Sequence, residues 1–343
     1  MRRQRREKHR TVPPGFTLVE LLVVLAVIGL LAAILLPVLG GVVESNRRLR
    51  CQNNLRELGI ALRTFHTSRE HWPAGAESRE YPVSPGHPHA YYRWSALARL
   101  LPYLEFSQNR DSLSLNFDVP LYMPNLQVSV ENTTAVGTLI ESFLCPSDRS
   151  IAVAVGFGPV NYVTCTGSGA EGGTPFKTDG MFYINSALTS RDVRDGESHT
   201  VLMSESLLGD GPEQFFNRKL ATAERVYTFA NVSPLTEAAC RQSSLFNFTN
   251  RRGFSWANGE YRTTMYNHHR TPNSKDLDCV SNRLVGDVTV RYAAYGWRTA
   301  RSNHAGGVNV LTADGAVWFI GDSIDAAIWR AVSTREGGEQ ERF

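Results

Sequence analysis

Residues 15–20 read Gly15-Phe16-Thr17-Leu18-Val19-Glu20 and lie between a basic N-terminal segment and the apolar run Leu21–Leu36. Glu20 therefore places a carboxylate at the edge of a segment of membrane-crossing length. An unpaired charge in that position costs a few kcal/mol or more, so charged side chains there usually have a partner and a function. We expect Glu20 to have such a partner.

The positive charge of the chain is concentrated at its N-terminus. Residues 1–15 hold six Lys or Arg and one Glu, which leaves 30 basic and 32 acidic residues from Phe16 onward, out of 36 and 33 in all 343 residues. The formal charge of +3 therefore belongs to the N-terminal segment. Apart from basic loops such as Arg251-Arg252, the slightly acidic remainder does not favour nucleic-acid binding or DNA uptake.

The segment from Phe16 to Val43 contains one charged residue, Glu20. Its 28 residues exceed the roughly 20 that a helix needs to cross a bilayer. A secretory signal peptide is cleaved after its apolar core, whereas here the small residue Gly15 precedes that core. Cleavage between Gly15 and Phe16 would keep the apolar helix as an anchor. The positive-inside rule then places residues 1–15 in the cytoplasm and the chain beyond residue 43 outside.

This arrangement resembles the prepilin signal of type IV pilins and of the pseudopilins of type II secretion systems. The matching positions are Gly15, Phe16, Thr17, Leu18, Glu20 and Leu21. The resemblance implies cleavage after Gly15 and N-methylation of Phe16 by a prepilin peptidase/N-methyltransferase, with Glu20 as the self-assembly carboxylate. In a filament, Glu20 would pair with the α-amine of Phe16 on a neighbouring subunit. The alternative is a plain single-pass anchor with an incidental glutamate.

The next residues predict an amphipathic helix. Apolar side chains recur at spacings of 4, 3, 4 and 3 at Cys51, Leu55, Leu58, Leu62 and Phe65. Pro37 and Gly40-Gly41 are expected to kink or loosen the helix before this stripe. We therefore divide the chain into a basic leader (1–15), a transmembrane helix (16–43), the soluble part of the same helix (44–66) and an extracytoplasmic head (67–343), which is periplasmic or on the cell surface.

The head is rich in Gly, Pro, Ser, Thr and Asn and its apolar runs are short, which is typical of β-structure with long loops. A short helix is expected over 94–101, ending near Pro102, and an insertion of loops and short strands over about 207–290. Asp314-Gly315 between two β-prone runs predicts a type I′ hairpin over about 307–320. The predicted fold is α+β and pilin-like, with a long N-terminal helix packed on a mainly antiparallel β head.

Several head segments resemble a prepilin-like family that is common in planctomycete genomes, has a domain of unknown function and ends in a signature of His, nine residues and Asp-Gly. The segments are Cys51-Gln52-Asn53-Asn54-Leu55-Arg56-Glu57-Leu58-Gly59, Leu100-Leu101-Pro102-Tyr103-Leu104-Glu105, Phe143-Leu144-Cys145-Pro146-Ser147-Asp148, Asn161-Tyr162, Asp195-Gly196-Glu197-Ser198-His199-Thr200, and His304 with Asp314-Gly315. This resemblance implies an architecture but no reaction or ligand.

The five cysteines would face an oxidising compartment in this topology, which allows disulfides. Since Cys51 and Cys145 both lie in segments that resemble the family, a bond between them is the first expectation. Cys240–Cys279 would then close the insertion and leave Cys165 free. Cys145–Cys165 stays an alternative, because connectivity cannot be read from a sequence.

No group of residues predicts catalysis. His304 and Asp314 are expected at opposite ends of a strand, and a turn aspartate usually serves the backbone, so a structural role is favoured over a metal or ligand site. The stretch Thr166-Gly167-Ser168-Gly169-Ala170 only approaches a nucleophile elbow.

The sequence patterns that could indicate a metal site are equally weak. His87-Pro88-His89 and His268-His269 lack the ligand spacing of zinc sites and are expected in surface loops. Asp179, Asp192, Asp195 and Asp314 do not form a calcium loop. We expect no enzyme activity, no cofactor and no metal.

The sequence therefore predicts a membrane-anchored pilin-like subunit or pseudopilin with a structural or assembly role in a type IV pilus or a type II secretion-like pseudopilus. Its expected partners are the prepilin peptidase/N-methyltransferase, other pilin-like subunits and the membrane, without nucleic acid. The alternative is a solitary exported, membrane-anchored protein that binds a ligand or carbohydrate through the loops of the head.

Overall fold

The computed structural model describes residues 17–79, 91–104, 113–123, 127–210, 214–215, 225–247, 251–281 and 294–338, and for residues 32–42 and 214–215 the backbone alone. Gly15, Phe16 and His87-Pro88-His89 lie outside the described residues. The chain divides into two units, Met1–Asn46 and Arg47–Phe343, and each is considered by itself.

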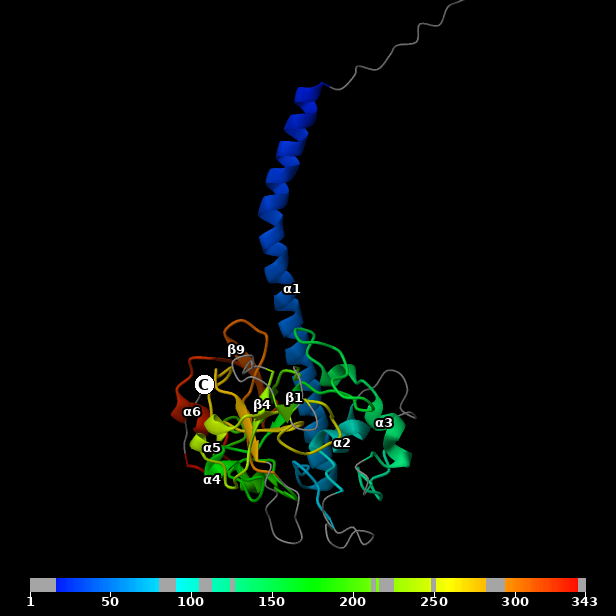
Figure 1. Ribbon diagram of the computed structural model, residues 1–343, viewed down its shortest axis with the longest axis vertical. Coiled ribbons are helices and arrows are strands. Elements are labelled where there is room, and N and C mark those ends of the chain that lie inside the picture. The colour runs from blue at the N-terminus through cyan, green and yellow to red at the C-terminus, as the bar shows by residue number, and fades with distance from the viewer. Residues whose placement is uncertain are drawn as a thin grey trace, which may run out of the picture. The chain divides into compact units, whose positions relative to one another are not determined.

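The longest element is helix α1, which runs from Leu18 to Arg69 (Figure 1). It continues as helix through Pro37 and Gly40-Gly41 and passes the predicted end at residue 66. Glu70 adopts a left-handed conformation with φ of 63°, and its N–H bonds the carbonyl of His66 at 2.8 Å. This closure of the last turn is a common way for a helix to end.

In the first unit, the part of α1 from Leu18 to Leu31 carries apolar side chains on all sides, with Glu20 as its one charged residue. Every large apolar side chain from Leu18 to Leu31 is exposed, from 45% for Val24 to 73% for Leu18. A helix that packs against a globular core shows a single apolar stripe instead. Among the helices whose side chains the structure describes, none combines the length and the hydrophobicity that crossing a membrane requires.

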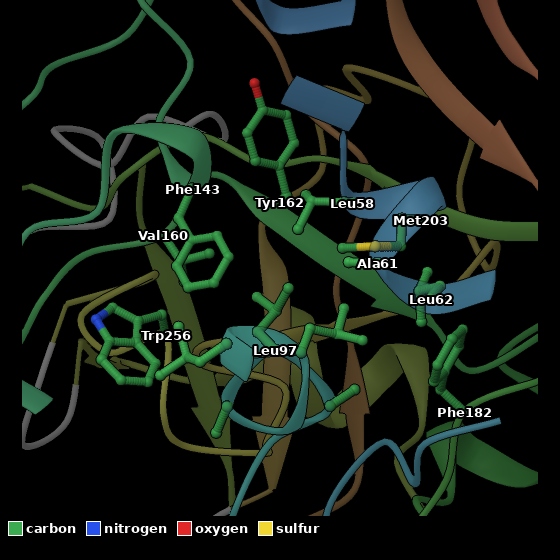
Figure 2. Packing of buried hydrophobic residues seen from close by; sticks show 14 of the residues in the cluster. Leu58, Ala61, Leu62, Leu97, Phe143, Val160, Tyr162, Phe182, Met203 and Trp256 are labelled. Atoms are coloured by element: carbon green, nitrogen blue, oxygen red, sulfur yellow. The ribbon is translucent and has the colours of Figure 1, made fainter. Parts of the chain in front are cut away.

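In the second unit, the predicted stripe of α1 is buried. Cys51, Leu55, Leu58 and Leu62 are fully buried and Phe65 nearly so, whereas Ile60 on the other side is 66% exposed. The amphipathic pattern is thus confirmed. Figure 2 shows Leu58, Leu62 and the neighbouring Ala61 packed with Met203 and Tyr162, two residues of the first sheet.

The first sheet has the strand order β10-β9-β2-β1-β6. Its strands are β1 (Tyr162–Cys165), β2 (Val201–Glu205), β6 (Met265–Tyr266), β9 (Gly307–Thr312) and β10 (Val317–Gly321). Three of its pairings are antiparallel, but β1 and β6 run parallel, so the sheet is mixed.

The two faces of this sheet are covered by different helices. Leu311 of β9 lies in the core cluster that contains the α1 stripe, whereas Val308 and Val310 pack with Trp329 of helix α6 (Ala326–Ala331). Because successive strand residues point to opposite faces, β9 is buried between the two helices. The approach of α1 is close, since a Cβ added at Gly59 would lie 2.9 Å from a methyl carbon of Leu311.

The second sheet has the strand order β3-β5-β4-β7-β8, and its β4–β7 pair is parallel. Its strands are β3 (Gln214–Phe215), β4 (Tyr227–Ala230), β5 (Leu245–Phe246), β7 (Asp278–Ser281) and β8 (Gly296–Trp297). Most of it comes from the expected insertion, which also supplies β6 to the first sheet. Six of the eight strand pairings in the described residues are antiparallel, so the head is α+β and mainly antiparallel, as predicted, with one parallel pair in each sheet.

The remaining helices are short. They are α2 (Ala96–Leu100), α3 (Thr133–Gly137), α4 (Ala170–Gly173) and α5 (Glu237–Gln242), with 3₁₀ turns at Leu101–Tyr103, Val130–Asn132, Glu141–Phe143 and Ser190–Asp192 (Figure 1). Helix α2 starts at the N-cap Ser95, whose hydroxyl accepts the N–H of Ala98 at 3.0 Å. The predicted helix before Pro102 is therefore present.

The C-terminal hairpin β9–β10 forms, but its turn is not the predicted type I′. That turn needs positive φ at two central residues, and in this loop only Gly315 has one, at 89°. Asp314 instead uses its carboxylate, which accepts the hydroxyl of Thr312 at 2.6 Å and the N–H of Ala316 at 3.0 Å. The side chain thus holds a three-residue loop with glycine in the left-handed position.

Candidate functional site

Thr17 and Glu20 form a capping box at the start of α1. Oε2 of Glu20 accepts the N–H of Thr17 at 2.9 Å and its hydroxyl at 2.7 Å, while the hydroxyl oxygen of Thr17 accepts the N–H of Glu20 at 3.3 Å. Such reciprocal bonds satisfy N–H groups that a helix start leaves without partners. The predicted assembly carboxylate therefore has a local role in helix initiation.

His304, the first signature residue, lies in a fully buried polar cluster. Its Nε2 is 3.6 Å from Sγ of Cys145 and 3.2 Å from Oε1 of Glu205. The four residues Cys51, Cys145, Glu205 and His304 are exposed by 0%, 4%, 1% and 3%. They come from α1, from the loop after residue 143, from the end of β2 and from the loop before β9.

Cys51 and Cys145 are joined by a disulfide, with 5.0 Å between their Cα atoms, and Cys240 and Cys279 by a second one. These are the pairs expected first from the sequence. Cys165 is a free thiol in β1. Burial raises the pKa of its thiol to about 12, so it is neither a nucleophile nor a ready metal ligand.

Glu205 was not singled out by sequence reasoning, yet it organises the cluster. Its Oε2 accepts the N–H of Asn309 at 2.8 Å, and its Oε1 accepts the side-chain amide of Asn309 at 3.0 Å. The side chain of Gln52 in turn donates to Oδ1 of Asn309 at 3.0 Å. A signal was present in the sequence, since a carboxylate ends the otherwise uncharged run Val201-Leu202-Met203-Ser204-Glu205.

Three of the segments that carried the family resemblance, 51–59, 143–148 and 161–162, meet at the same place. The amide of Asn54 donates to the carbonyl of Leu144 at 2.8 Å, and Tyr162 donates to the carbonyl of Cys51 at 3.3 Å. Oδ1 of Asn161 accepts the N–H of Cys145 at 3.1 Å. Segments far apart in sequence thus form one hydrogen-bonded junction around the disulfide.

Asp314 and Gly315 lie at the other end of β9 from His304, as the sequence predicted. The turn they form contacts a different part of α1, where Arg63 donates to the carbonyl of Ala313 at 2.7 Å. Glu197 completes this contact, since its carbonyl accepts the N–H of Asp314 at 3.1 Å and its carboxylate lies 3.4 Å from Arg63. The two halves of the signature therefore form separate contacts.

A polar hollow lies between the loop around residues 166–179 and residues 335–336. Its charged lining comprises Glu171, Lys177, Asp179, Arg335 and Glu336. Glu171 and Lys177 have φ of 51° and 43°, a left-handed conformation that is uncommon for residues other than glycine and that concentrates at functional sites. The hollow offers charges of both signs to a small polar ligand.

Ser168, the serine of the glycine-rich stretch, is bonded to Asp179. Its hydroxyl donates to that carboxylate, and its N–H donates to Oδ1 at 2.9 Å. The hydroxyl oxygen also accepts the N–H of Ala170 at 3.3 Å. Among its described contacts there is no histidine base, so the arrangement lacks the partner that activates a serine nucleophile.

The other aspartates considered for calcium are used by nearby backbone. Asp192 accepts the N–H of Thr189 at 2.7 Å, and these hydrogen bonds from Thr189 lower the pKa of the carboxyl. Asp195 accepts the N–H groups of Gly337 and Gly338, both at 2.8 Å. Their oxygens are committed to separate turns.

The prediction that His268 and His269 lie in surface loops is wrong for His268. This residue is fully buried, and its ring stacks on that of Trp329 with centroids 3.5 Å apart. Burial lowers the pKa of His268 to about 3, so the ring stays neutral. The half-buried His269 stacks on Trp297 and lies 2.8 Å from Glu237.

Arg252 does not belong to a basic surface loop either. It is 1% exposed and pairs with the equally buried Asp278, which also bonds Arg301 at 3.0 Å. Arg298 joins the cluster, and burial lowers its pKa to about 9. These arginines stabilise the interior and cannot contact phosphates of a nucleic acid from where they lie.

Comparison with known protein families gives two matches. The family described as "Protein of unknown function (DUF1559)" matches residues 44–327, and the motif described as "Prokaryotic N-terminal methylation motif" matches residues 14–36. The first match includes all four residues of the His304 cluster, and the second includes Gly15, Phe16 and Glu20. No curated protein and no solved structure matches the chain.

Proposed function

The chain belongs to the family of proteins of unknown function DUF1559, with an N-terminal methylation motif, and on this basis we propose that it is a membrane-anchored, non-enzymatic pilin-like subunit of a type IV pilus or a type II secretion-like pseudopilus. The motif is the signal of a prepilin-type, processed and exported protein. The finer role rests on one observation, the exposure of every large apolar side chain of α1 from Leu18 to Leu31. Such a surface needs lipid or the same segment of other subunits around it.

In the proposed pathway, the segment 16–43 crosses the membrane and the leader 1–15 stays in the cytoplasm. Cleavage after Gly15 would then expose the α-amine of Phe16 close to the capping box. Both capping bonds of Glu20 use Oε2. Within the described chain its Oε1 makes no hydrogen bond, so this oxygen is available to the amine of a neighbouring subunit, where the two opposite charges would leave water together.

Two substitutions separate helix capping from charge pairing. Glu20→Gln keeps an oxygen that can cap the helix, since Gln serves in capping boxes as well as Glu, but it removes the charge. Thr17→Ala removes the capping hydroxyl and keeps the charge. If Glu20 acts in assembly, Glu20→Gln abolishes filaments while cleavage after Gly15 continues, and Thr17→Ala retains them.

Assembly is measured as filaments in the fraction sheared from the cell surface. Cleavage is measured from the N-terminal mass of the membrane-bound protein. Wild type and both variants are expressed as full chains in a host that contains a prepilin peptidase. The filament role would be contradicted if the wild-type protein is cleaved after Gly15 but, like both variants, stays a dispersed membrane monomer.

That outcome would favour the second function, an exported and anchored binding protein. The polar hollow lined by Glu171, Lys177 and Asp179 favours it specifically, because two of these residues hold the left-handed conformation. We would test it by thermal-shift screening of small sugars and charged metabolites against the full chain and Lys177→Gly. Glycine relieves the backbone conformation and removes the charge, so a ligand of the hollow must lose its stabilising shift.

A further inference from the structure

The buried cluster around His304 combines the side-chain types that bind zinc. One ligand atom each from Cys51, Cys145, Glu205 and His304 lies within 4.8 Å of all the others. Two sulfurs, one imidazole nitrogen and one carboxylate oxygen are all atom types that Zn²⁺ binds, and four such donors suit its tetrahedral coordination. It is the only such group among the residues whose side chains the structure describes.

The distances within the cluster fit a metal of that size. With Zn–S of about 2.3 Å and Zn–N or Zn–O of about 2.0–2.1 Å, a tetrahedron has S···N edges of about 3.6 Å and N···O edges of about 3.3 Å. The corresponding separations are 3.6 Å from Sγ of Cys145 to Nε2 of His304 and 3.2 Å from that nitrogen to Oε1 of Glu205. Two of the six separations between the four ligand atoms are therefore already close to those of a tetrahedral zinc site.

A second layer of contacts orients these ligands. Asn309 holds Glu205 by two hydrogen bonds of 2.8 and 3.0 Å and is itself held by Gln52 at 3.0 Å. The N–H of Cys145 is fixed by Asn161 at 3.1 Å. Metal sites depend on such outer partners, and losing one typically lowers the metal affinity about 10–100-fold.

We propose that Cys51, Cys145, His304 and Glu205 form a Zn²⁺ site whenever the Cys51–Cys145 disulfide is reduced. A dithiol supplies two electrons and two protons to the disulfide and becomes a disulfide itself, leaving two thiols in the cluster. Zn²⁺ then displaces both thiol protons, and His304 binds the metal through Nε2 in the neutral tautomer that carries its proton on Nδ1.

Charge supports this exchange. In the zinc form, the two positive charges of the metal cancel the two negative charges of the thiolates. Two thiolates without a metal would instead add two negative charges to a site that excludes water, which burial opposes strongly. Zinc is thus the partner that lets both cysteines ionise in place.

The thiol state would then control occupancy. A dithiol reductant opens the site to zinc, and oxidation to the disulfide removes two ligands and releases the metal. The site itself does not depend on the pilin-like role, so either proposal can fail alone. Cys240–Cys279 provides an internal comparison, since within the described part of the chain it belongs to no group of metal-ligating side chains.

The test uses the full chain in detergent with Co²⁺ as a spectroscopic probe for zinc. The protein is reduced with dithiothreitol, desalted without oxygen and titrated, and a parallel sample is kept oxidised. We expect one Co²⁺ per reduced chain, with the visible d–d bands and thiolate charge-transfer bands of a tetrahedral site, and none per oxidised chain. Zn²⁺ should displace the Co²⁺ and abolish the colour.

Variants locate the site. His304→Ala and the pair Cys51→Ser with Cys145→Ser should lose the spectrum, Asn309→Ala should weaken binding about 10–100-fold, and the pair Cys240→Ser with Cys279→Ser should retain it. A reduced, folded chain that binds no Co²⁺, or a spectrum unchanged by His304→Ala, overturns the proposal.

Circular dichroism of the same samples distinguishes loss of the metal site from loss of the fold. If reduction alone unfolds the chain, Zn²⁺ must restore the spectrum of the wild type and of the variant lacking Cys240 and Cys279, but not that of His304→Ala. A reduced wild-type chain that stays unfolded with Zn²⁺ counts against the site.

Discussion

The disulfide between Cys51 and Cys145 is expected to be the more stabilising of the two. It joins residues 94 apart in sequence, whereas Cys240–Cys279 joins residues 39 apart. A cross-link stabilises mainly by restricting the unfolded chain, and the effect grows with the length of the closed loop. Replacing each pair by two serines therefore removes a different amount of unfolded-state constraint.

The magnitudes follow from these loop lengths. At 25 °C the loop-closure entropy gives about 4.7 kcal/mol for the Cys51–Cys145 loop and about 3.9 kcal/mol for the Cys240–Cys279 loop. Burying serine hydroxyls adds to both losses, but the pairs are similarly buried, Cys51 and Cys145 at 0% and 4% and Cys240 and Cys279 at 3% and 0%. This contribution nearly cancels in the comparison, which leaves a difference of about 0.8 kcal/mol in the free energy of unfolding.

The assay is guanidinium unfolding of the oxidised full chain in detergent, followed by tryptophan fluorescence. Trp72, Trp94, Trp256 and Trp329 are at most 2% exposed and report on the loss of the core. We expect both double variants to lose about 4–5 kcal/mol by linear extrapolation, with the larger loss for Cys51 and Cys145. A loss below about 2 kcal/mol for that pair, or a smaller one than for the control pair, would refute the loop-entropy reasoning.

Three further predictions concern single buried residues. Cys165 is the free thiol of the described chain, and burial raises its pKa to about 12, so it should react with iodoacetamide only after unfolding. Rapid labelling of the native protein, detected by mass spectrometry, would contradict its burial. Burial lowers the pKa of His268 to about 3, so only the unfolded state binds its proton between about pH 6.5 and 3. The contribution of neutral His268 to the free energy of unfolding is therefore fully present above about pH 6.5 and falls by up to about 5 kcal/mol as the pH drops to 3. In His268→Gln the free energy of unfolding should depend less on pH across this range, and an unchanged pH dependence would argue against a buried neutral His268. Leu62→Ala should cost about 2–5 kcal/mol in chemical unfolding, whereas Ile60→Ala on the exposed side of the same helix should cost less than about 0.5 kcal/mol, and equal losses would refute the assigned face.

Local patterns were the part of the structure that the sequence predicted well. The stripe from Cys51 to Phe65 depends on the period of one helix, and the hairpin at 307–320 depends on two adjacent β-prone runs. Each is decided by neighbours in sequence. The detail of the hairpin turn was wrong because the carboxylate of Asp314 bonds its own loop, which favours a conformation other than type I′.

Long-range contacts could not be predicted in the same way. Glu205 and His304 are 99 residues apart and meet because β2 pairs with β9. The burial of His268 depends on its stacking against Trp329 from another part of the chain. The parallel pairing of β4 with β7 likewise depends on the path of the intervening residues. None of these leaves a periodic pattern, so composition and spacing pointed instead to surface loops and an insertion.

The contacts of β9 with helix α1 explain the spacing between His304 and Asp314. At one end of β9 Gln52 bonds Asn309, and just beyond the other end Arg63 bonds the carbonyl of Ala313. Between these contacts the helix rises about 16 Å and the extended chain about 13 Å. The two lengths are close enough for the long side chains of Gln52 and Arg63 to make up the difference.

A nine-residue separation between His304 and Asp314 allows both ends of β9 to engage α1 at once. A strand longer or shorter by one residue would turn Asn309 and Leu311 to the opposite face, because side chains alternate along a strand. Asn309 would then leave Glu205, and Leu311 would leave the core around Leu58 and Leu62. The signature therefore describes how a helix is seated on a sheet, and the cluster at His304 is the end of that contact where the ligand chemistry is concentrated.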